Sequence, residues 1–426
     1  MRYRNIDPNL FKSNRSELFK LLSNNSIAVF NSNDLMPKNA DQLMSFKQNS
    51  DMFYLSGIDQ EETILVLMKY DEKMEEILFV RETNDTIKIW EGEKISQKQA
   101  KNISGINKVF WNTEFESVLP SLINKVKTIY LNSNEHPRAN VVVETRDARF
   151  KKWIQSKYPD YIYKKSAALL HNIRSIKKSE EINLIQHACD ITKKGVERVC
   201  RHLKPGVFEY EIQAEIIHEF LLNNSRGFAY DPIIASGKNA CILHYDSNND
   251  LCNDGDLVLM DFGAEYANYA SDLTRCFPVN GRFNKRQKDV YNSVLRVMNE
   301  AKKLLKPGIF LSDYEKSVGV LMERELVNLG LISIKDIAEF QTTPAYKKYY
   351  MHGTSHHLGL DVHDVSNPAK PLEEGMVLTC EPGIYIPEEN LGIRLENDIL
   401  IQKSGNIDLM AEIPIAAEEI EDMLNI

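Results

Sequence analysis

The sequence lacks several features that mark common classes of protein. It has no excess of basic residues, since 52 Lys and Arg stand against 61 Asp and Glu and the formal net charge is −9. Nucleic-acid binding without sequence preference needs a basic face, so we expect no nucleic-acid partner. No run approaches the roughly 18 consecutive apolar residues of a membrane span, and no apolar core follows the N-terminal MRYRNIDPNLF. We therefore expect no secretory signal, no membrane partner and a cytoplasmic protein.

Cysteine is scarce and is not arranged as a disulfide framework. The six cysteines contain no C-x-x-C pair, and in a chain of this length they are typical of small buried apolar side chains. They are Cys189, Cys200, Cys241, Cys252, Cys276 and Cys380. The chain also lacks a glycine-rich phosphate loop. His218 and Glu219 begin like the helix of a zinc protease, but Leu222 stands where the second histidine is required.

The chain is long enough and apolar enough to form two domains. Its 426 residues are 43% hydrophobic and 27% charged, which is ordinary for globular proteins with sizeable cores. Residues 1–172 alternate β-branched or Leu-rich runs with helical stretches, and this predicts an α/β domain. The expected strands are residues 27–30, 63–68 and 77–80, and the expected helices are residues 113–125 and 145–156.

A domain boundary is predicted within the basic, polar segment 171–178. Ser179 is then expected to cap a helix whose first turn carries Glu180 and Glu181. From Leu257 the pattern changes to strands and hairpins, so we predict an α+β domain over residues 173–426, with helices grouped against an antiparallel sheet. Further helices are expected at residues 210–222, 285–305 and 312–328, and the acidic tail 417–426 as a helix or a frayed end.

Histidine is concentrated in one short segment. Four of the ten histidines fall between His352 and His363, in the string MHGTSHHLGLDVHDV. Imidazole is a common metal ligand and a common acid or base, whereas isolated histidines such as His187 and His218 are more typical of a core or a surface. The spacing does not choose among His352, His356, His357 and His363.

The first of two predicted hairpins carries a pair of acidic residues. An apolar strand, residues 257–260, leads into Asp261, and the return strand begins with Asp272. A turn centred between Tyr266 and Ala267 would place these two carboxylates directly opposite each other. Opposed residues on antiparallel strands have Cβ atoms about 4.5–5.5 Å apart. Such carboxylates repel and raise one another's proton affinity, and a bound cation removes the conflict.

The second hairpin repeats this construction. Residues 375–380 lead into Glu381, the return strand 392–401 contains Glu396, and a turn between Glu388 and Glu389 would oppose the two acids. Each acid alone is more typical of a solvated turn, but the set predicts a dinuclear site in which two divalent ions share a nucleophilic water. Oxygen ligands with one nitrogen favour Mn²⁺, with Co²⁺, Zn²⁺ or Fe²⁺ as alternatives.

The motifs around these residues resemble those of the aminopeptidase P (Xaa-Pro aminopeptidase) family, within the creatinase/methionine-aminopeptidase "pita-bread" group. They are NACILHYDSN (239–248), MDFGAEYANYASDLTR (260–275), HGTSHHLGLDVHDV (352–365), EPGIYI (381–386) and GIRLEND (392–398). Upstream, FKQNSDMFYLSGI (46–58) looks like the family's N-terminal domain. The resemblance covers nearly the whole chain. It implies an α+β protein with an N-terminal α/β (creatinase-like) domain, residues 1–172, and a C-terminal pita-bread metallopeptidase domain, residues 173–426.

Taken residue by residue, the resemblance implies a centre of two divalent metal ions. Asp261 would bind one ion through both oxygens, Asp272 and Glu396 would bridge the two ions, and His356 and Glu381 would complete the other site.

The resemblance also implies catalytic roles around the centre. His244 and His363 would transfer protons or stabilise the charged tetrahedral intermediate, and Glu381 would pass the water's proton to the proline nitrogen.

On the substrate side, His352 would line the pocket that holds proline. Arg394 and Tyr385 are expected to support the ligands. Trp90, in KIWEGEK, is expected either as an aromatic of the substrate pocket or as a buried structural residue. In the family, the residue that follows the ligand histidine is often aromatic, but here that position is His357. Because adjacent strand residues point to opposite faces, we expect it in packing or at the surface.

The implied function is a dinuclear-metal aminopeptidase that hydrolyses the N-terminal Xaa-Pro bond of peptides through a metal-bridging hydroxide. Its partners would be peptides with proline in second position, and we expect a homo-oligomer, a dimer or a tetramer. The alternative is prolidase, which cleaves Xaa-Pro dipeptides with the same fold and ligands. The QNSDMFYLSG segment and the short 385–392 connection favour aminopeptidase P. A non-catalytic pita-bread binding module and a metal-free creatinase-like hydrolase are disfavoured, because all five ligand positions are intact.

Overall fold

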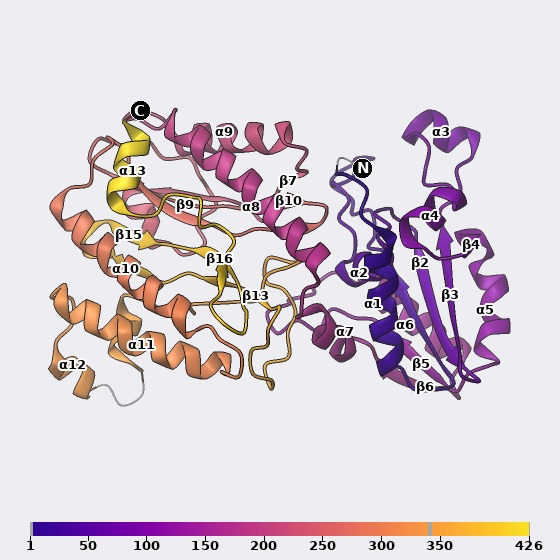
Figure 1. The fold of residues 1–426 in the computed structure, drawn as a ribbon. Coiled ribbons are helices and arrows are strands. Elements are labelled where there is room, and N and C mark those ends of the chain that lie inside the picture. The colour runs from indigo at the N-terminus through magenta and orange to yellow at the C-terminus, as the bar shows by residue number, and fades with distance from the viewer. Residues whose placement is uncertain (1–2, 340–342, 426) are drawn as a thin grey trace. The chain divides into compact units, whose positions relative to one another are not determined.

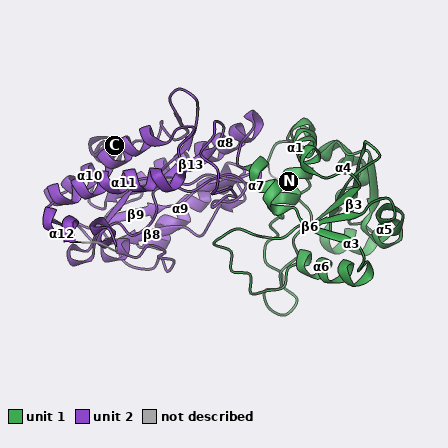
Figure 2. Cartoon of the chain, turned by 90° about the horizontal axis from the view of Figure 1, so that it is seen from below, with its two compact units in different colours: residues 1, 3–174 green, residues 2, 175–426 purple. Residues whose placement is uncertain are grey.

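The computed structural model describes residues 3–339 and 343–425, and the chain divides into two compact units, Tyr3–Arg174 and Ser175–Ile426 (Figures 1 and 2). The boundary therefore lies between Arg174 and Ser175, whereas the sequence suggested one between residues 172 and 173. No helix in the described part of the chain is long and apolar enough to cross a lipid bilayer.

The first unit is built on a six-stranded mixed sheet in the order β4-β3-β2-β1-β5-β6. Strand β1 pairs antiparallel with β2 and parallel with β5. The strands are β1 (Ser26–Asn31), β2 (Ile64–Tyr70), β3 (Lys73–Val80), β4 (Lys108–Trp111), β5 (Thr128–Leu131) and β6 (Ile162–Lys165). The helices are α1 (Pro8–Leu21), α2 (Ser50–Ser56), α3 (Asp85–Glu91), α4 (Gln97–Ser104), α5 (Phe115–Ile123), α6 (Arg146–Lys157) and α7 (Ala167–Arg174).

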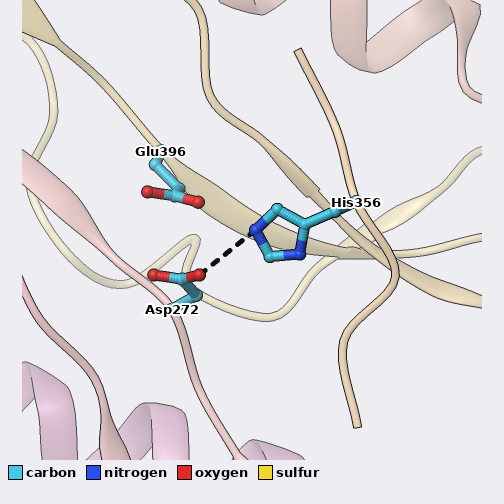
Figure 3. Close-up of side chains that lie close together, drawn as sticks. All are labelled: Asp272, His356 and Glu396. Carbon is cyan, nitrogen blue, oxygen red and sulfur yellow. Dashed lines mark ion pairs between the residues drawn. The ribbon is translucent and has the colours of Figure 1, made fainter. Parts of the chain in front are cut away.

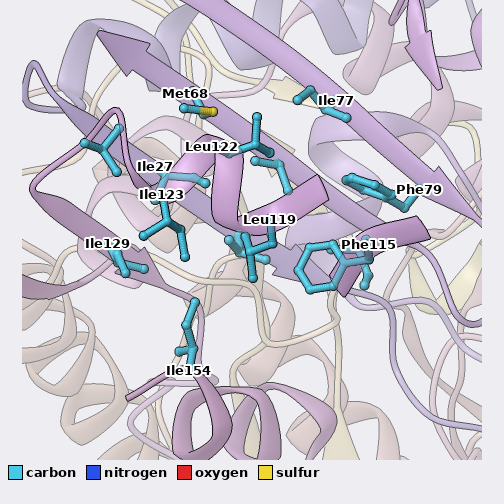
Figure 4. Close-up of a cluster of buried hydrophobic side chains, with 14 of the residues drawn as sticks. Ile27, Met68, Ile77, Phe79, Phe115, Leu119, Leu122, Ile123, Ile129 and Ile154 are labelled. Carbon is cyan, nitrogen blue, oxygen red and sulfur yellow. The ribbon is translucent and has the colours of Figure 1, made fainter. Parts of the chain in front are cut away.

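The core of this unit follows from the alternation of side chains along its strands. Ile27 and Val29 of β1, like Ile77 and Phe79 of β3, are two residues apart and therefore share one face of the sheet. Side chains of α5 and α6, among them Phe115, cover that face (Figure 4). The predicted strands and helices of residues 27–30, 63–68, 77–80, 113–125 and 145–156 are confirmed within a few residues at each end.

The second unit consists of small antiparallel sheets and long helices. The sheets have the orders β12-β9-β8, β11-β10-β7, β13-β16-β17 and β14-β15, and every pairing in the described part of this unit is antiparallel. The strands are β7 (Gly227–Phe228), β8 (Ile233–Ser236), β9 (Leu257–Asp261), β10 (Ala264–Tyr266), β11 (Tyr269–Ala270), β12 (Thr274–Pro278), β13 (Val377–Cys380), β14 (Gly383–Ile386), β15 (Leu391–Arg394), β16 (Asn397–Leu400) and β17 (Ile407–Asp408).

Helices α8 and α9 pack beside each other, as do α10 and α11 (Figure 1). The helices are α8 (Ser179–Cys200), α9 (Glu209–Leu222), α10 (Lys285–Leu304), α11 (Leu311–Asn328), α12 (Ile334–Glu339) and α13 (Ala417–Leu424). The predicted α+β class of this unit and its helices are confirmed, although β7 and β8 precede the residue at which the sequence pattern changes. All six cysteines are free, and five are buried, as predicted; Cys241 is half-buried.

The predicted start of α8 is wrong by one residue. Lys178 is the N-cap, and Ser179 is already the first helical residue. Glu181 takes the capping role, because its Oε2 accepts a hydrogen bond from the Lys178 backbone N–H at 3.0 Å. The Ser179 hydroxyl donates to Glu180 instead.

The register of the first acid-bearing hairpin also differs from the prediction. Asp261 lies opposite Thr274, so Asp272 is not its direct partner. The reason is the turn: Ala267 and Asn268 both take positive φ, 52° and 67°, as a two-residue hairpin turn of the primed type requires. The turn is therefore centred one position later than predicted.

The register of the second hairpin is confirmed. Cys380 lies opposite Asn397 on one side, and Gly383 lies opposite Arg394 on the other. Both pairings belong to a single register, in which Glu381 corresponds to Glu396. The turn between β14 and β15 is centred where the sequence placed it.

Gly263 offers a test of the first hairpin. A Cβ at this position would lie 1.7 Å from the Ser271 carbonyl oxygen, and a backbone atom cannot move aside cheaply. We expect Gly263→Ala to destabilise this unit by on the order of 3 kcal/mol, and to lower its melting temperature by roughly 6–12 °C. Gly353→Ala is the matched control, since its Cβ would meet only Glu315 at 3.6 Å. Equal melting temperatures for the two variants would contradict this account of the hairpin.

Candidate metal centre

Four carboxylates and one imidazole come together at the ends of the antiparallel strands of the second unit. Asp261 is the last residue of β9, and Asp272 lies two residues before β12. Glu381 follows β13, Glu396 immediately precedes β16, and His356 lies in the irregular segment before β13. Strand ends hold these side chains on rigid backbone while leaving their polar tips free to converge.

Asp272, His356 and Glu396 form the tightest group. One ligand atom from each lies within 4.8 Å of the others. Figure 3 shows the His356 ring directed between the two carboxylates, with its Nε2 3.4 Å from Asp272 Oδ2. The backbone joins two of these segments directly, because the Glu396 N–H donates to the Thr274 carbonyl at 3.1 Å.

The other two carboxylates border this group. Glu381 Oε1 lies 3.5 Å from His356 Nε2. The Tyr230 hydroxyl lies between Asp261 and Asp272: it donates to Asp261 Oδ1 at 2.6 Å and also contacts Asp272 Oδ1. All five residues that the sequence singled out as ligands are therefore brought together.

Arg394 holds one edge of the cluster. Its guanidinium donates to Asp261 Oδ2, to the Tyr385 hydroxyl at 2.8 Å and to Thr274 Oγ1 at 3.1 Å. The Thr274 hydroxyl in turn donates to Glu396 Oε2 at 2.6 Å. This chain of contacts orients two carboxylates at once.

The buried carboxylates are poorly compensated. Burial, followed by the neighbouring carboxylates, raises the pKa of Glu396 well above its usual range, and burial raises the pKa of Glu381 to about 7. Burial also raises the pKa of Asp261, although Arg394 opposes this. For His356, burial favours the neutral ring, but Asp272 and Glu381 outweigh it and raise the pKa to about 9.

The arrangement fits divalent cations. Glu396 Oε1 is buried and accepts no hydrogen bond from any described residue, which leaves a carboxylate oxygen open to a cation. Oxygen ligands with one imidazole suit Mn²⁺ and the other first-row divalent ions. Neutralising several mutually repelling carboxylates is what such an ion does.

The remaining histidines occupy different surroundings. His352 lies beside the cluster, with Nε2 2.7 Å from the Tyr385 hydroxyl and its ring edge against Tyr350. Burial lowers its pKa to about 3, and Arg394 and other cationic groups add to the effect. The exposed His363 stacks edge-on to the ligand candidate His356, at 4.3 Å between ring centroids.

His357 lies outside the group of ligand candidates, as expected. It is buried, with its backbone bridged to Leu378, and its Nδ1 has no hydrogen-bond partner among the described residues. Burial lowers its pKa to about 3, so the ring packs as a neutral side chain. The expectation assumed a continuous strand, whereas only an isolated bridge forms here.

Trp90 is 82% exposed on α3, a helix without any buried residue. The alternative that it is a buried structural tryptophan is therefore wrong.

Sequence reasoning missed several supporting residues. Asp398 Oδ2 accepts the Asp272 backbone N–H at 3.0 Å, and the Thr379 hydroxyl accepts the His356 backbone N–H at 3.1 Å. Thr379 was detectable, because it lies two residues before Glu381 and residues so spaced share a strand face. Tyr230 was not, since a single tyrosine in a loop carries no pattern.

Comparisons with known proteins agree with this geometry. Residues 183–403 match Metallopeptidase family M24, and residues 11–130 match Aminopeptidase P, N-terminal domain. The Xaa-Pro aminopeptidase of Escherichia coli (strain K12) is 35% identical over 428 residues, which cover 97% of each chain. Human Xaa-Pro aminopeptidase 3 is 30% identical over 394 residues, which cover 89% of this chain and 77% of the human one.

Solved structures share the whole fold. A putative aminopeptidase P from Bacillus anthracis superposes with a TM-score of 0.92 at 34% identity, with 99% of both chains covered. Zn-substituted E. coli aminopeptidase P in complex with product gives a TM-score of 0.89 at 34% identity, with the same coverage. The predicted resemblance and the two-domain pita-bread fold are confirmed. With more than half of its residues matched by the family and relatives over 30% identical along nearly its whole length, the chain belongs to metallopeptidase family M24, in the aminopeptidase P group.

Proposed function

We propose that this protein is a metal-dependent aminopeptidase that hydrolyses the bond between the N-terminal residue of a peptide and a following proline. The observation that carries the proposal is the convergence of Asp272, His356 and Glu396 in a chain whose relatives are Xaa-Pro aminopeptidases. A metal centre alone would fit many hydrolases. The relatives, which are Xaa-Pro aminopeptidases, indicate which bond is cleaved.

Two divalent ions are proposed for the centre. Asp272 and Glu396 would bridge them, Asp261 would complete one site, and His356 and Glu381 the other. The proposal is supported by the Tyr230 hydroxyl between Asp261 and Asp272 and by the 3.4 and 3.5 Å approaches of His356 to Asp272 and Glu381. When bound, the ions would supply an acidified water and polarise the carbonyl before proline.

The chain's own residues would move protons and hold the substrate. Glu381, a buried carboxylate whose Oε1 lies 3.5 Å from His356 Nε2, would accept the proton of the attacking water and deliver it to the proline nitrogen. His244 and His363 would donate to the oxyanion that develops on the carbonyl. His352, neutral and flanked by Tyr350 and Tyr385, would line the pocket for the proline ring.

Arg394 and Tyr385 would orient the ligands and border the substrate. This is supported by the contacts of Arg394 with Asp261 and Tyr385. Trp90, whose exposed ring is available for contact, is proposed as a further substrate aromatic.

We further propose that manganese is the metal, since carboxylate oxygens dominate the ligand set. The protein would act in the cytoplasm as a homo-oligomer, a dimer or a tetramer. The net charge of −9 supports the absence of a nucleic-acid partner, and no membrane partner is proposed.

Substrate length separates aminopeptidase P from prolidase. After chelation and readdition of Mn²⁺, Co²⁺ or Zn²⁺ in turn, we expect release of the first residue from a Xaa-Pro-Xaa tripeptide. An otherwise identical tripeptide with alanine in place of proline should be a poor substrate. Chromatography of the products is the measurement. Cleavage of Xaa-Pro dipeptides alone would reassign the enzyme to prolidase, and activity that survives chelation would remove the metal from the reaction.

Ligand substitutions test the centre itself. Asp272→Asn and His356→Ala should each abolish peptide hydrolysis, with a loss well beyond the roughly 10–100-fold that follows removal of a supporting residue. Bound metal, measured by elemental analysis, should fall while the circular dichroism spectrum is retained. Matched controls are Glu388→Gln and His218→Ala, which change exposed residues outside the cluster. Near-normal rates in either ligand variant would show that the ligands are misassigned.

The stability of the metal-free protein should fall as pH rises. Burial raises the pKa of Glu381 from 4.5 to about 7, and the pKa of His356 is raised from 6.5 to about 9. His352 and His357, whose pKa values are lowered to about 3, are neutral in the folded and in the unfolded chain above about pH 7. Between about pH 7 and pH 9 the folded state therefore binds more protons than the unfolded chain, mainly at His356, and its stability decreases with pH. A metal replaces these protons, so the rise in melting temperature on adding Mn²⁺ should be larger at pH 8 than at pH 5.5. An equal or smaller rise at pH 8 would contradict this electrostatic description.

A further inference from the structure

Glu209, the first residue of α9, is a fully buried carboxylate that lies outside the metal cluster. Its Oε1 accepts the Ser236 backbone N–H at 2.7 Å and the Asn239 side-chain N–H at 3.1 Å. Its Oε2 accepts the Tyr245 hydroxyl at 2.7 Å and the Asp250 backbone N–H at 2.9 Å. Four donors thus satisfy one anion, and no described residue forms an ion pair with it.

All four donors come from one stretch of chain, residues 236–250. This stretch leaves β8 at Ser236 and contains the NACILHYDSN motif, of which only His244 has a proposed role. Burying a carboxylate without a cation is costly unless hydrogen bonds replace its water. Hydrogen bonds to a charged acceptor are about twice as strong as neutral ones, so Glu209 ties this irregular stretch to α9.

The stretch has a second fixed point near Ala240. A Cβ on Gly392 of β15 would lie 2.1 Å from the Ala240 carbonyl oxygen, so only glycine permits this approach. The stretch therefore packs against β15, the strand that also contains Arg394.

His244 depends on this backbone for its position. It is exposed, and its ring makes no hydrogen bond to any described residue, whereas the next residue, Tyr245, donates a hydrogen bond to Glu209.

We propose that Glu209 is a positioning residue, which places the His244 imidazole by anchoring residues 236–250 through Ser236, Asn239, Tyr245 and Asp250. This inference rests on the proposed function for the role of His244. It assigns Glu209 no contact with substrate or metal.

A double-mutant cycle distinguishes this role from a general structural one. General acid–base groups contribute roughly 10²–10⁴-fold, so we expect His244→Ala to lower kcat/KM on a Xaa-Pro-Xaa tripeptide by about 100-fold. Glu209→Gln presents an N–H to at least one donor and should lower it by about 10–100-fold. In the double variant we expect the kcat/KM of His244→Ala alone, within about threefold. Once the imidazole has been removed, loss of the anchor that positions it should have no further effect on kcat/KM.

The control is Glu211→Gln, the same chemical change on an exposed residue of the same helical turn. It should leave kcat/KM within about twofold of wild type. Bound metal should be unchanged in Glu209→Gln. If Glu209→Gln proves too unstable to assay, Tyr245→Phe, which removes one of the four donors, replaces it. Its kcat/KM should fall by a smaller factor, and the fall should again disappear when His244 is already alanine. Multiplicative losses in the double variant, or a loss of metal in Glu209→Gln, would overturn the proposal.

Amide hydrogen exchange tests the anchor independently of activity. Glu209→Gln should increase exchange across residues 236–250 by at least about tenfold, while exchange in β9 and β16 stays at wild-type rates. Unchanged exchange in 236–250 would overturn the proposal. If the anchor is confirmed by exchange but the wild-type protein cleaves no Xaa-Pro peptide, the failure lies in the proposed function. If Xaa-Pro cleavage is present but His244→Ala is as active as wild type, the positioning role falls while the proposed function stands.

Discussion

The repulsion among Asp261, Asp272, Glu381 and Glu396 is the constraint around which the second unit is organised. Burial removes the water that would otherwise solvate these carboxylates, and the pKa values of Asp261, Glu381 and Glu396 rise in response. Charges of one sign held together in a buried site are tolerated only when cations, hydrogen bonds or protons offset them. A site built in this way has a strong electrostatic preference for divalent cations, and that preference links its architecture to hydrolytic chemistry.

The surrounding structure supplies only part of the compensation. Arg394 contributes one positive charge to Asp261, and Tyr230 contributes one hydroxyl that contacts both Asp261 and Asp272. Glu396 keeps an oxygen with no hydrogen-bond partner among the described residues. A protein selected for stability alone would have paired that oxygen or replaced it. Incomplete compensation at rigid strand ends is therefore the physical sign of a binding site.

Several elements were predictable because their signals are local. Short β-branched or Leu-rich runs identified the strands of the first unit, and helical spacing identified α8 to α11. The second acid-bearing hairpin was placed in its correct register because its turn lies symmetrically between two apolar runs. The first hairpin was misplaced because Ala267 adopts a positive φ, which alanine rarely does, so that no glycine marked the turn. The helix start at Lys178 was missed for a related reason: the cap is a glutamate three residues later, not the expected serine.

The sequence by itself determined the fold class, the two acid pairs and a histidine-rich segment, and with the family resemblance it identified the aminopeptidase P group. It could not choose among four histidines, because His356 differs from His357 only in the direction of its side chain, and that direction depends on how the segment meets β13. Only the tertiary structure revealed Tyr230, Asp398 and Glu209. Tyr230 and Asp398 contact ligand candidates that lie 31 and 126 positions away in the sequence, and Glu209 holds the stretch 236–250. Contacts of this kind arise from packing between distant segments, so no spacing along the chain records them.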